Sequence, residues 1–205
     1  FDNYEIEVRL YNCDDTHMKI VIKDNGIGIS AEQLKKMCNV GVSYSGDKAR
    51  KEEIESMPIW LRPTAGFGIG LQSIFLVANE FEIYSKAAGE DGIYAKVTSQ
   101  RKNGYVQVSK LDKLKYQGTE IHIVIPRRFE FEVGAIVNTY AYMKNEYDVF
   151  SDKRDLIYYA IWDDLRLMMG KIYFPVKLFF ENILIDTVKR EWFEELKEYI
   201  SSERY

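Results

Sequence analysis

The sequence has few cysteines and no long hydrophobic run, and these absences exclude several classes of protein. Its two cysteines, Cys13 and Cys38, have no metal-binding spacing, and two cysteines make no disulfide framework. Its apolar runs, such as IFLVA at 74–78, are far too short to span a bilayer, and no signal peptide is visible. We therefore expect a reduced, cytoplasmic protein that does not bind a membrane.

An excess of positive charge is also missing. Lys and Arg number 28 against 32 Asp and Glu, so the formal net charge is −4. Proteins that bind nucleic acid broadly do so by neutralising phosphates, so nucleic acid is not an expected partner, although a local site for one nucleotide is compatible with this charge. The 205 residues are 46% hydrophobic and 29% charged, which is the composition of an ordinary globular chain.

The sequence lacks an initiator Met and begins almost inside a strand, so we expect it to be a fragment of a longer protein. YEIEVRLY (4–11) alternates strictly between apolar and polar residues, which predicts a half-buried strand. HMKIVIK (17–23) predicts the return strand, with Met18, Ile20 and Ile22 facing the core.

The stretch IVIKDNGIGIS (20–30) ends a β-branched run at an acid, Asp24, and then begins a helix. Ser30 and Gln33 have the spacing of a helix-capping box. Asp-Asn-Gly alone indicates only a turn. A carboxylate partly buried at a strand end, however, needs a hydrogen-bond donor or loses about 1–3 kcal/mol or more. The exocyclic amine of adenine is such a donor, and Gly28 would let a flat base approach the backbone.

A second group of glycines, Gly66, Gly68 and Gly70, precedes a helical apolar spacing over 71–78, which predicts a buried helix. Backbone N–H groups at a helix start form an anion site that suits a phosphate, while a flexible entry to the helix is the simpler alternative. The two common nucleotide motifs are absent, because the sequence has no G-x-x-x-x-G-K-[ST] and GFGIG is not G-x-G-x-x-G.

The remaining residues predict a series of strands followed by mixed elements. The predicted strands are 81–86, 93–98, 105–110 and 118–126, the last opened by Gly118-Thr119. The predicted later elements are helices at 130–147, 154–169 and 192–200, with a hairpin of 171–180 and 183–186 around Glu181-Asn182.

This order predicts an α+β fold, a two-layer α/β sandwich with a mostly antiparallel sheet under a helical layer. We predict that residues 1–128 form this domain. Residues 129–205 would form a helical and β-hairpin extension, or the start of a second domain.

Three motifs in this order resemble those of the gyrase, heat-shock chaperone, histidine kinase and MutL (GHKL) ATPase superfamily. DNGIGIS (24–30) matches its D-x-G-x-G box, and GTEIHIVIP (118–126) resembles its Gly-Thr strand box. GFGIGLQSIFLVAN (66–79) resembles its second glycine box, in the form seen in the heat-shock protein 90 family. The resemblance covers about residues 4–126 and implies the Bergerat-type ATP-binding fold.

The resemblance also implies roles for residues around the first and last motifs. Asp24 would accept a hydrogen bond from adenine, Gly28 would lie beside the base, and Gly26 would be part of the same nucleotide-binding loop. Ile29 would pack against the ring, and the Thr119 hydroxyl would complete the base site directly or through water.

Further roles follow for the residues between these motifs. Asn39 would match an Asn that contacts the ribose or a phosphate, although a small length difference leaves that pairing open. Residues 40–64 would be the ATP lid, and Gly66, Gly68 and Gly70 would approach the phosphates. ATP or ADP would be the ligand, with Mg²⁺ held through the nucleotide phosphates and no metal ligand in the chain.

The function that the resemblance implies is the ATP-binding domain of a heat-shock protein 90-like chaperone ATPase. Nucleotide would order the lid and signal to the following domain. In the family, the general-base Glu and an Mg²⁺-binding Asn lie on a helix before the first strand, hence before Phe1. No catalytic residue is therefore assigned, and ATP hydrolysis is expected by analogy alone.

Two alternatives stay open at this point. One is a histidine-kinase catalytic domain, which shares the Asp and Gly-Thr boxes. The other is a non-catalytic module of the same fold that binds nucleotide or protein. Relatives dimerise, which implies a homodimer for the full-length protein, and the sequence names no client.

Several other polar residues have simpler interpretations. His17 and His122 fall on the polar parity of their strands, so we expect surface roles rather than metal binding or acid–base chemistry. Lys48, Arg50 and Lys51 could reach phosphates, but a solvated charged loop is the simpler interpretation.

Overall fold

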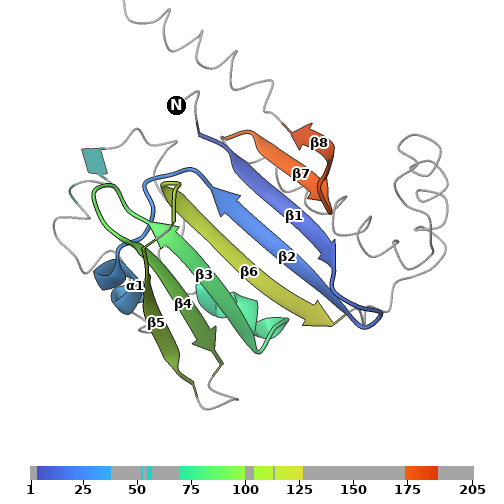
Figure 1. Ribbon diagram of the computed structural model, residues 1–205, viewed down its shortest axis with the longest axis horizontal. Coiled ribbons are helices and arrows are strands. Elements are labelled where there is room, and N and C mark those ends of the chain that lie inside the picture. Colours follow the sequence, from blue (N-terminus) through green and yellow to red (C-terminus); the bar gives the residue numbers. More distant parts are fainter. Residues whose placement is uncertain are drawn as a thin grey trace, which may run out of the picture. The chain divides into compact units, whose positions relative to one another are not determined.

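The computed structural model describes residues 4–37, 52, 55–56, 70–99, 104–112, 114–126 and 174–188 (Figure 1). The chain divides into two compact units, one of Lys23–Ile125 and one of Phe1–Ile22 with Pro126–Tyr205. The described ranges contain eight strands, mostly antiparallel, and few, short helices.

The Lys23–Ile125 unit is built on four strands that the sequence predicts. They are β3 (Glu80–Lys86), β4 (Gly92–Thr98), β5 (Val106–Leu111) and β6 (Gly118–Pro126). They lie side by side in the order β5-β4-β3-β6, and each neighbouring pair is antiparallel (Figure 1). The four predicted strands are therefore confirmed.

One face of this sheet is the core of the unit, because burial alternates along β3, the strand that lies between β4 and β6. On β3 the buried parity is Phe81, Ile83 and Ser85, and Ile83 has no exposed surface. Ile83 pairs with Ala95 of β4 and with Ile121 of β6. Ser85 is the one polar member of that buried set on β3, and it pairs with Thr119 of β6.

Helix α1 (Ala31–Met37) begins as the sequence predicts. The backbone N–H of Gln33 donates to Ser30 Oγ at 3.1 Å, and the backbone N–H of Ser30 donates to Gln33 Oε1 at 2.9 Å. These two reciprocal bonds are a complete capping box, so the prediction is confirmed. Leu34 anchors the helix, since its side chain has no exposed surface.

The predicted buried helix after the second group of glycines is wrong. The chain forms η3 (Leu71–Leu76), a short 3₁₀ helix in which no residue is buried. Leu76 is 81% exposed, and burial begins only beyond the helix, at Ala78. A 3₁₀ helix has about three residues per turn, so apolar residues spaced three and four apart for an α-helix no longer all share one face.

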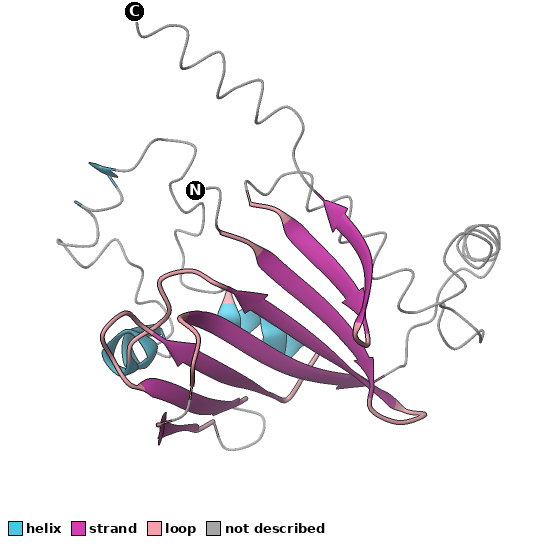
Figure 2. Cartoon of the chain, turned by 45° about the horizontal axis from the view of Figure 1, so that its top comes forward, coloured by secondary structure: helices cyan, strands magenta, loops and turns pink. Residues whose placement is uncertain are grey.

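The other unit pairs the first strands of the chain with a hairpin near its end. Its strands are β1 (Ile6–Asn12), β7 (Val176–Phe180), β8 (Ile183–Val188) and β2 (His17–Asp24) as far as Ile22, because Lys23 and Asp24 belong to the first unit. Strand β7 runs parallel to β1, with Ile6 opposite Val176, and antiparallel to β8 (Figure 2). The hairpin around Glu181-Asn182 is confirmed, and its first strand completes the sheet beside β1.

The core of β2 differs from the prediction. Met18 has no exposed surface, as expected, but Ile22 is 37% exposed and Val21 is the second buried residue, at 4%. Met18 and Val21 have opposite parity, so burial does not stay on one face along this strand. Strict alternation therefore cannot identify its core.

The sheet prediction is confirmed as mostly antiparallel, whereas a helical layer is not seen among the described residues. The predicted helices at 130–147, 154–169 and 192–200 lie outside them. So does the predicted domain boundary at 128, and these stay predictions. Within the part of the chain that the structure describes, no helix is long and apolar enough to cross a membrane.

Candidate functional site

Asp24 ends β2 with its carboxylate partly buried. Its Oδ1 accepts a hydrogen bond from the backbone N–H of Gly26 at 2.8 Å. The backbone N–H of Thr119, at the start of β6, also donates to this carboxylate. Both donors are backbone amides, and among the described residues no Lys or Arg pairs with Asp24.

This environment disfavours the charged form of Asp24. Burial raises the pKa of the Asp24 carboxyl above its ordinary 3.8, and the amides of Gly26 and Thr119 only partly oppose that shift. A charged donor would compensate the lost hydration, but the described contacts supply only neutral amides. The carboxylate can therefore gain from a further donor in a ligand.

Gly28 is required by the packing of its own loop. Its φ is +75°, and a Cβ there would lie 2.0 Å from the carbonyl oxygen of Lys86 and 2.8 Å from the nitrogen of Ala87. Only glycine allows this approach to the end of β3. The backbone of β3 thus occupies the side on which a Cβ would stand, so a base beside Gly28 would have to approach from another direction.

Gly118 has a similar role at the start of β6. Its φ is +129°, and a Cβ there would lie 2.2 Å from the backbone oxygen of Asp24. The missing side chain lets β6 approach the end of β2, which allows the Thr119 amide to donate to the Asp24 carboxylate. The Gly-Thr pair therefore works as a unit, with one residue making room and the next donating.

Ser85 is a site residue that the sequence analysis missed. Its hydroxyl donates to the carbonyl of Gly118 at 2.9 Å, accepts the backbone N–H of Ile29 at 2.8 Å, and lies 3.0 Å from the hydroxyl of Thr119. It joins the loop after Asp24 to β6. The signal was present, because Ser85 is the polar residue on the apolar parity of FEIYSK.

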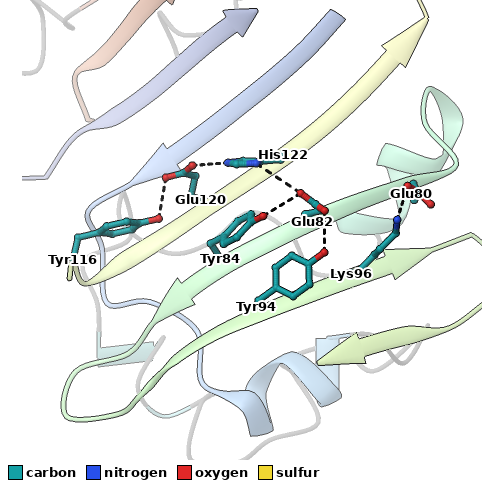
Figure 3. A network of polar contacts seen from close by, with 8 residues as sticks. All are labelled: Glu80, Glu82, Tyr84, Tyr94, Lys96, Tyr116, Glu120 and His122. Atoms are coloured by element: carbon teal, nitrogen blue, oxygen red, sulfur yellow. Dashed lines mark hydrogen bonds and ion pairs between the residues drawn. The ribbon is translucent and has the colours of Figure 1, made fainter. Parts of the chain in front are cut away.

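The opposite face of the same strands carries a polar network (Figure 3). Tyr84 and Glu120 are register partners next to the Ser85–Thr119 pair, and successive side chains point to opposite faces. In this polar network, Glu120 contacts Tyr116 at 2.9 Å and His122 at 2.5 Å. His122 also lies 3.9 Å from Glu82, and Glu82 accepts hydrogen bonds from Tyr84 at 3.2 Å and from Tyr94 at 2.9 Å.

Burial and neighbouring acids shift the ionisation of this network. Burial, followed by the charge of Glu82, raises the pKa of Tyr84 to about 12. Burial and a hydrogen bond to Glu120 raise the pKa of Tyr116, whereas the hydrogen bond from His122 lowers the pKa of Glu120. Of the residues that the structure describes, no three His, Cys, Asp or Glu side chains are grouped so that they could hold a metal ion.

The structure brings together some predicted site residues and leaves others untested. Asp24, Gly26, Gly28, Ile29 and Thr119 gather where the β2 end, its following loop, β3 and β6 meet. Gly70 is the exposed N-cap of η3, and a Cβ added there would meet nothing within 4 Å.

The other predicted site residues lie outside the described ranges. They are Asn39, Gly66, Gly68 and nearly all of the predicted lid at 40–64, including Lys48, Arg50 and Lys51. Their roles stay predictions.

The known proteins that this chain is similar to in sequence include HtpG chaperones of several bacteria. The chaperone protein HtpG of Clostridium botulinum (strain Loch Maree / Type A3) is 30% identical over 198 residues, covering 96% of this chain and 27% of the relative. HtpG of Rickettsia akari is 30% identical over 155 residues, or 68% of this chain and 22% of the relative. HtpG of Treponema denticola is 32% identical over 115 residues, or 55% of this chain and 17% of the relative. The chain thus spans about a quarter or less of these relatives.

Among solved structures, the MutL ATPase domain of Aquifex aeolicus complexed with ADP aligns with a TM-score of 0.44 at 18% identity. The alignment covers 97% of this chain and 61% of that one. No family model matches the chain. The sequence comparisons cover most of the chain. The chain is a distant homologue of the HtpG (heat-shock protein 90) chaperones and belongs with them to the GHKL ATPase superfamily.

Proposed function

We propose that residues 1–128 have the Bergerat-type fold and bind ATP, with the adenine amine donating to Asp24. The observation that supports this is the partly buried Asp24 carboxylate, which has only backbone amides as donors among the described residues. A base with an exocyclic amine supplies the missing donor. The resemblance of DNGIGIS (24–30) to the D-x-G-x-G box supports the same role for Asp24 by motif position.

The loop after Asp24 supports the second part of the proposal, which is that the base lies against this loop. Ile27, in the loop after Asp24, is 56% exposed, so its apolar side chain is accessible to a ligand. The backbone of Ile29 is held by Ser85 at 2.8 Å, and Gln117 Nε2 donates to the carbonyl of Gly26 at 3.3 Å. These bonds hold the loop in one conformation before ligand arrives, which lowers the ordering cost of binding.

The triphosphate would extend toward Gly66, Gly68 and Gly70, and residues 40–64 would close over it as a lid. We propose Mg²⁺ as a partner of the phosphates and not of protein side chains. Nucleotide binding would then signal to the segment after residue 128. Hydrolysis is proposed for the intact protein by analogy with HtpG, and no catalytic residue is assigned within these 205 residues.

The test is ATP binding to the full-length protein, measured by calorimetry with Mg²⁺. Asp24→Ala removes a charge-assisted hydrogen bond and should weaken binding about 10–100-fold. Asp112→Ala is the matched control, because Asp112 is an exposed acid outside the site. Equal affinity in wild type and Asp24→Ala, or equal losses in both variants, would contradict the proposed position of the base.

The same preparation separates the remaining alternatives. A non-catalytic module would bind ATP tightly but release no phosphate during long incubation. A histidine kinase would transfer phosphate to a histidine-bearing partner protein. The relatives described above are all chaperones, which favours ATP hydrolysis over histidine phosphotransfer.

A further inference from the structure

Ser85 stands at the centre of the proposed site without facing its ligand. Its side chain has no exposed surface. Its three polar neighbours come from three segments: the backbone of Ile29, the carbonyl of Gly118 and the hydroxyl of Thr119. A hydroxyl carries one hydrogen and two lone pairs, so these three contacts use its full capacity.

The hydrogens in this cluster can be assigned one by one. The Gly118 carbonyl has no hydrogen, so its 2.9 Å contact uses the hydrogen of Ser85. The amide of Ile29 donates to Ser85 Oγ, and this uses one lone pair. The 3.0 Å contact between Ser85 and Thr119 then uses the hydrogen of the Thr119 hydroxyl.

This assignment determines what Thr119 can offer a ligand. With its hydrogen directed at Ser85, Thr119 Oγ1 presents only lone pairs, and the Asp24 carboxylate is also only an acceptor. We propose that Ser85 is a positioning residue that holds the Thr119 hydroxyl as an acceptor, so that the site selects a base with an amino group over one with a carbonyl group. The proposal rests on the ATP-binding function proposed above.

The experiment compares ATP with inosine triphosphate, which carries a carbonyl oxygen where ATP carries the amine. Ser85→Ala leaves the Thr119 hydroxyl free to rotate and donate to that carbonyl. The measured quantity is the dissociation constant for inosine triphosphate divided by that for ATP. We expect this ratio to fall roughly 3–10-fold in Ser85→Ala relative to wild type. A role limited to stability would weaken both ligands equally and leave the ratio unchanged.

Two further variants isolate the hydroxyl pair. Ser85→Thr keeps a hydroxyl and should keep the wild-type ratio. Thr119→Val removes the hydroxyl that Ser85 acts on, so it should lower the ratio by itself. Adding Ser85→Ala to Thr119→Val should then change the ratio no further, because residues that act through one contact are not additive.

Each outcome separates this inference from the proposed function. Wild type that does not bind ATP overturns both. Wild type that binds ATP, with a ratio unchanged in Ser85→Ala, overturns the role of Ser85 alone. If Ser85→Ala does not fold, the test uses Thr119→Val and Ser85→Thr instead. The proposal is then overturned if the ratio of dissociation constants is unchanged in Thr119→Val or is lowered in Ser85→Thr.

Discussion

The backbone amide of Thr119 donates a hydrogen bond to the carboxylate of Asp24, so the start of β6 and the end of β2 share one polar contact. The contact depends on Gly118, because a Cβ there would lie 2.2 Å from the Asp24 backbone oxygen. Two of the three sequence motifs therefore meet in space. The carboxylate is oriented by the protein backbone before any ligand binds.

The raised pKa of Asp24 predicts an effect on stability. A carboxyl whose folded pKa lies above its ordinary 3.8 stabilises the fold below that value and loses this contribution as pH rises through the folded pKa. At neutral pH the ionised Asp24 is therefore a cost. Asp24→Asn keeps an oxygen for the Gly26 amide and removes the charge, so its Tm should exceed that of wild type at pH 7.

Thermal unfolding of both proteins between pH 3 and pH 7 checks this prediction. The gap in Tm should narrow as pH falls below 3.8. Although the Tm of Asp24→Asn should be higher than that of wild type at pH 7, this variant should bind ATP about 10–100-fold more weakly. A variant with a lower Tm than wild type at pH 7 would show that the charged carboxylate is stabilising.

Gly28 and Gly89 form a matched pair for a second prediction. Their φ values are +75° and +74°, but a Cβ at Gly89 would meet nothing within 4 Å, whereas at Gly28 it would collide with Lys86. Gly89→Ala should cost only the backbone strain, about 1–2 kcal/mol. Gly28→Ala should cost a further 1–3 kcal/mol or more, roughly the penalty of overpacking.

Urea unfolding of the two variants measures this difference. Because the backbone strain is common to both, the difference between them reports the contact of the loop with β3. Equal losses would show that the loop does not pack on the backbone of Lys86.

The polar network on the other face predicts how the free energy of unfolding depends on alkaline pH. The neutral phenol of Tyr84 is favoured in the fold, since its pKa rises from 10.0 to about 12. That contribution is complete below pH 10 and is lost as pH rises toward 12. In Tyr84→Phe the free energy of unfolding should fall less steeply across this window. Tyr105→Phe, at a side chain that is 48% exposed, is the control, and its curve should match wild type.

The C-terminal hairpin provides a prediction about the other unit. Leu178 of β7 is 2% exposed, whereas Leu184 of β8 is 50% exposed. Leu178→Ala should lower the free energy of unfolding by about 2–5 kcal/mol. Leu184→Ala should change it by about 0.5 kcal/mol or less. Similar small effects at both positions would indicate that β7 adds little to the sheet beside β1.

The elements that sequence predicts well here are those with a local cause. Ser30 and Gln33 cap α1 through side chains three residues apart, and alternation alone locates β3 and β6. The prediction failed at η3, because apolar spacing does not distinguish a 3₁₀ turn from an α-helix. It failed at Ile22 because parity was assumed constant along β2.

The candidate site was only partly predictable for a related reason. The motifs identify Asp24 and Thr119, but not the reason for the glycines around them. Gly28 and Gly118 are required by backbone that arrives from other segments, and Ser85 acts through a strand pairing. Such contacts depend on tertiary structure, which a single sequence pattern does not contain.

The parallel pairing of Ile6 with Val176 also sets the order of events during synthesis. Strand β1 leaves the ribosome before its partner β7, which follows only after the intervening chain has been made. At about 5–20 residues per second, one edge of β1 waits for roughly 10–30 s without that partner. For that interval the nascent chain presents an open strand edge, the kind of surface that holding chaperones protect from aggregation.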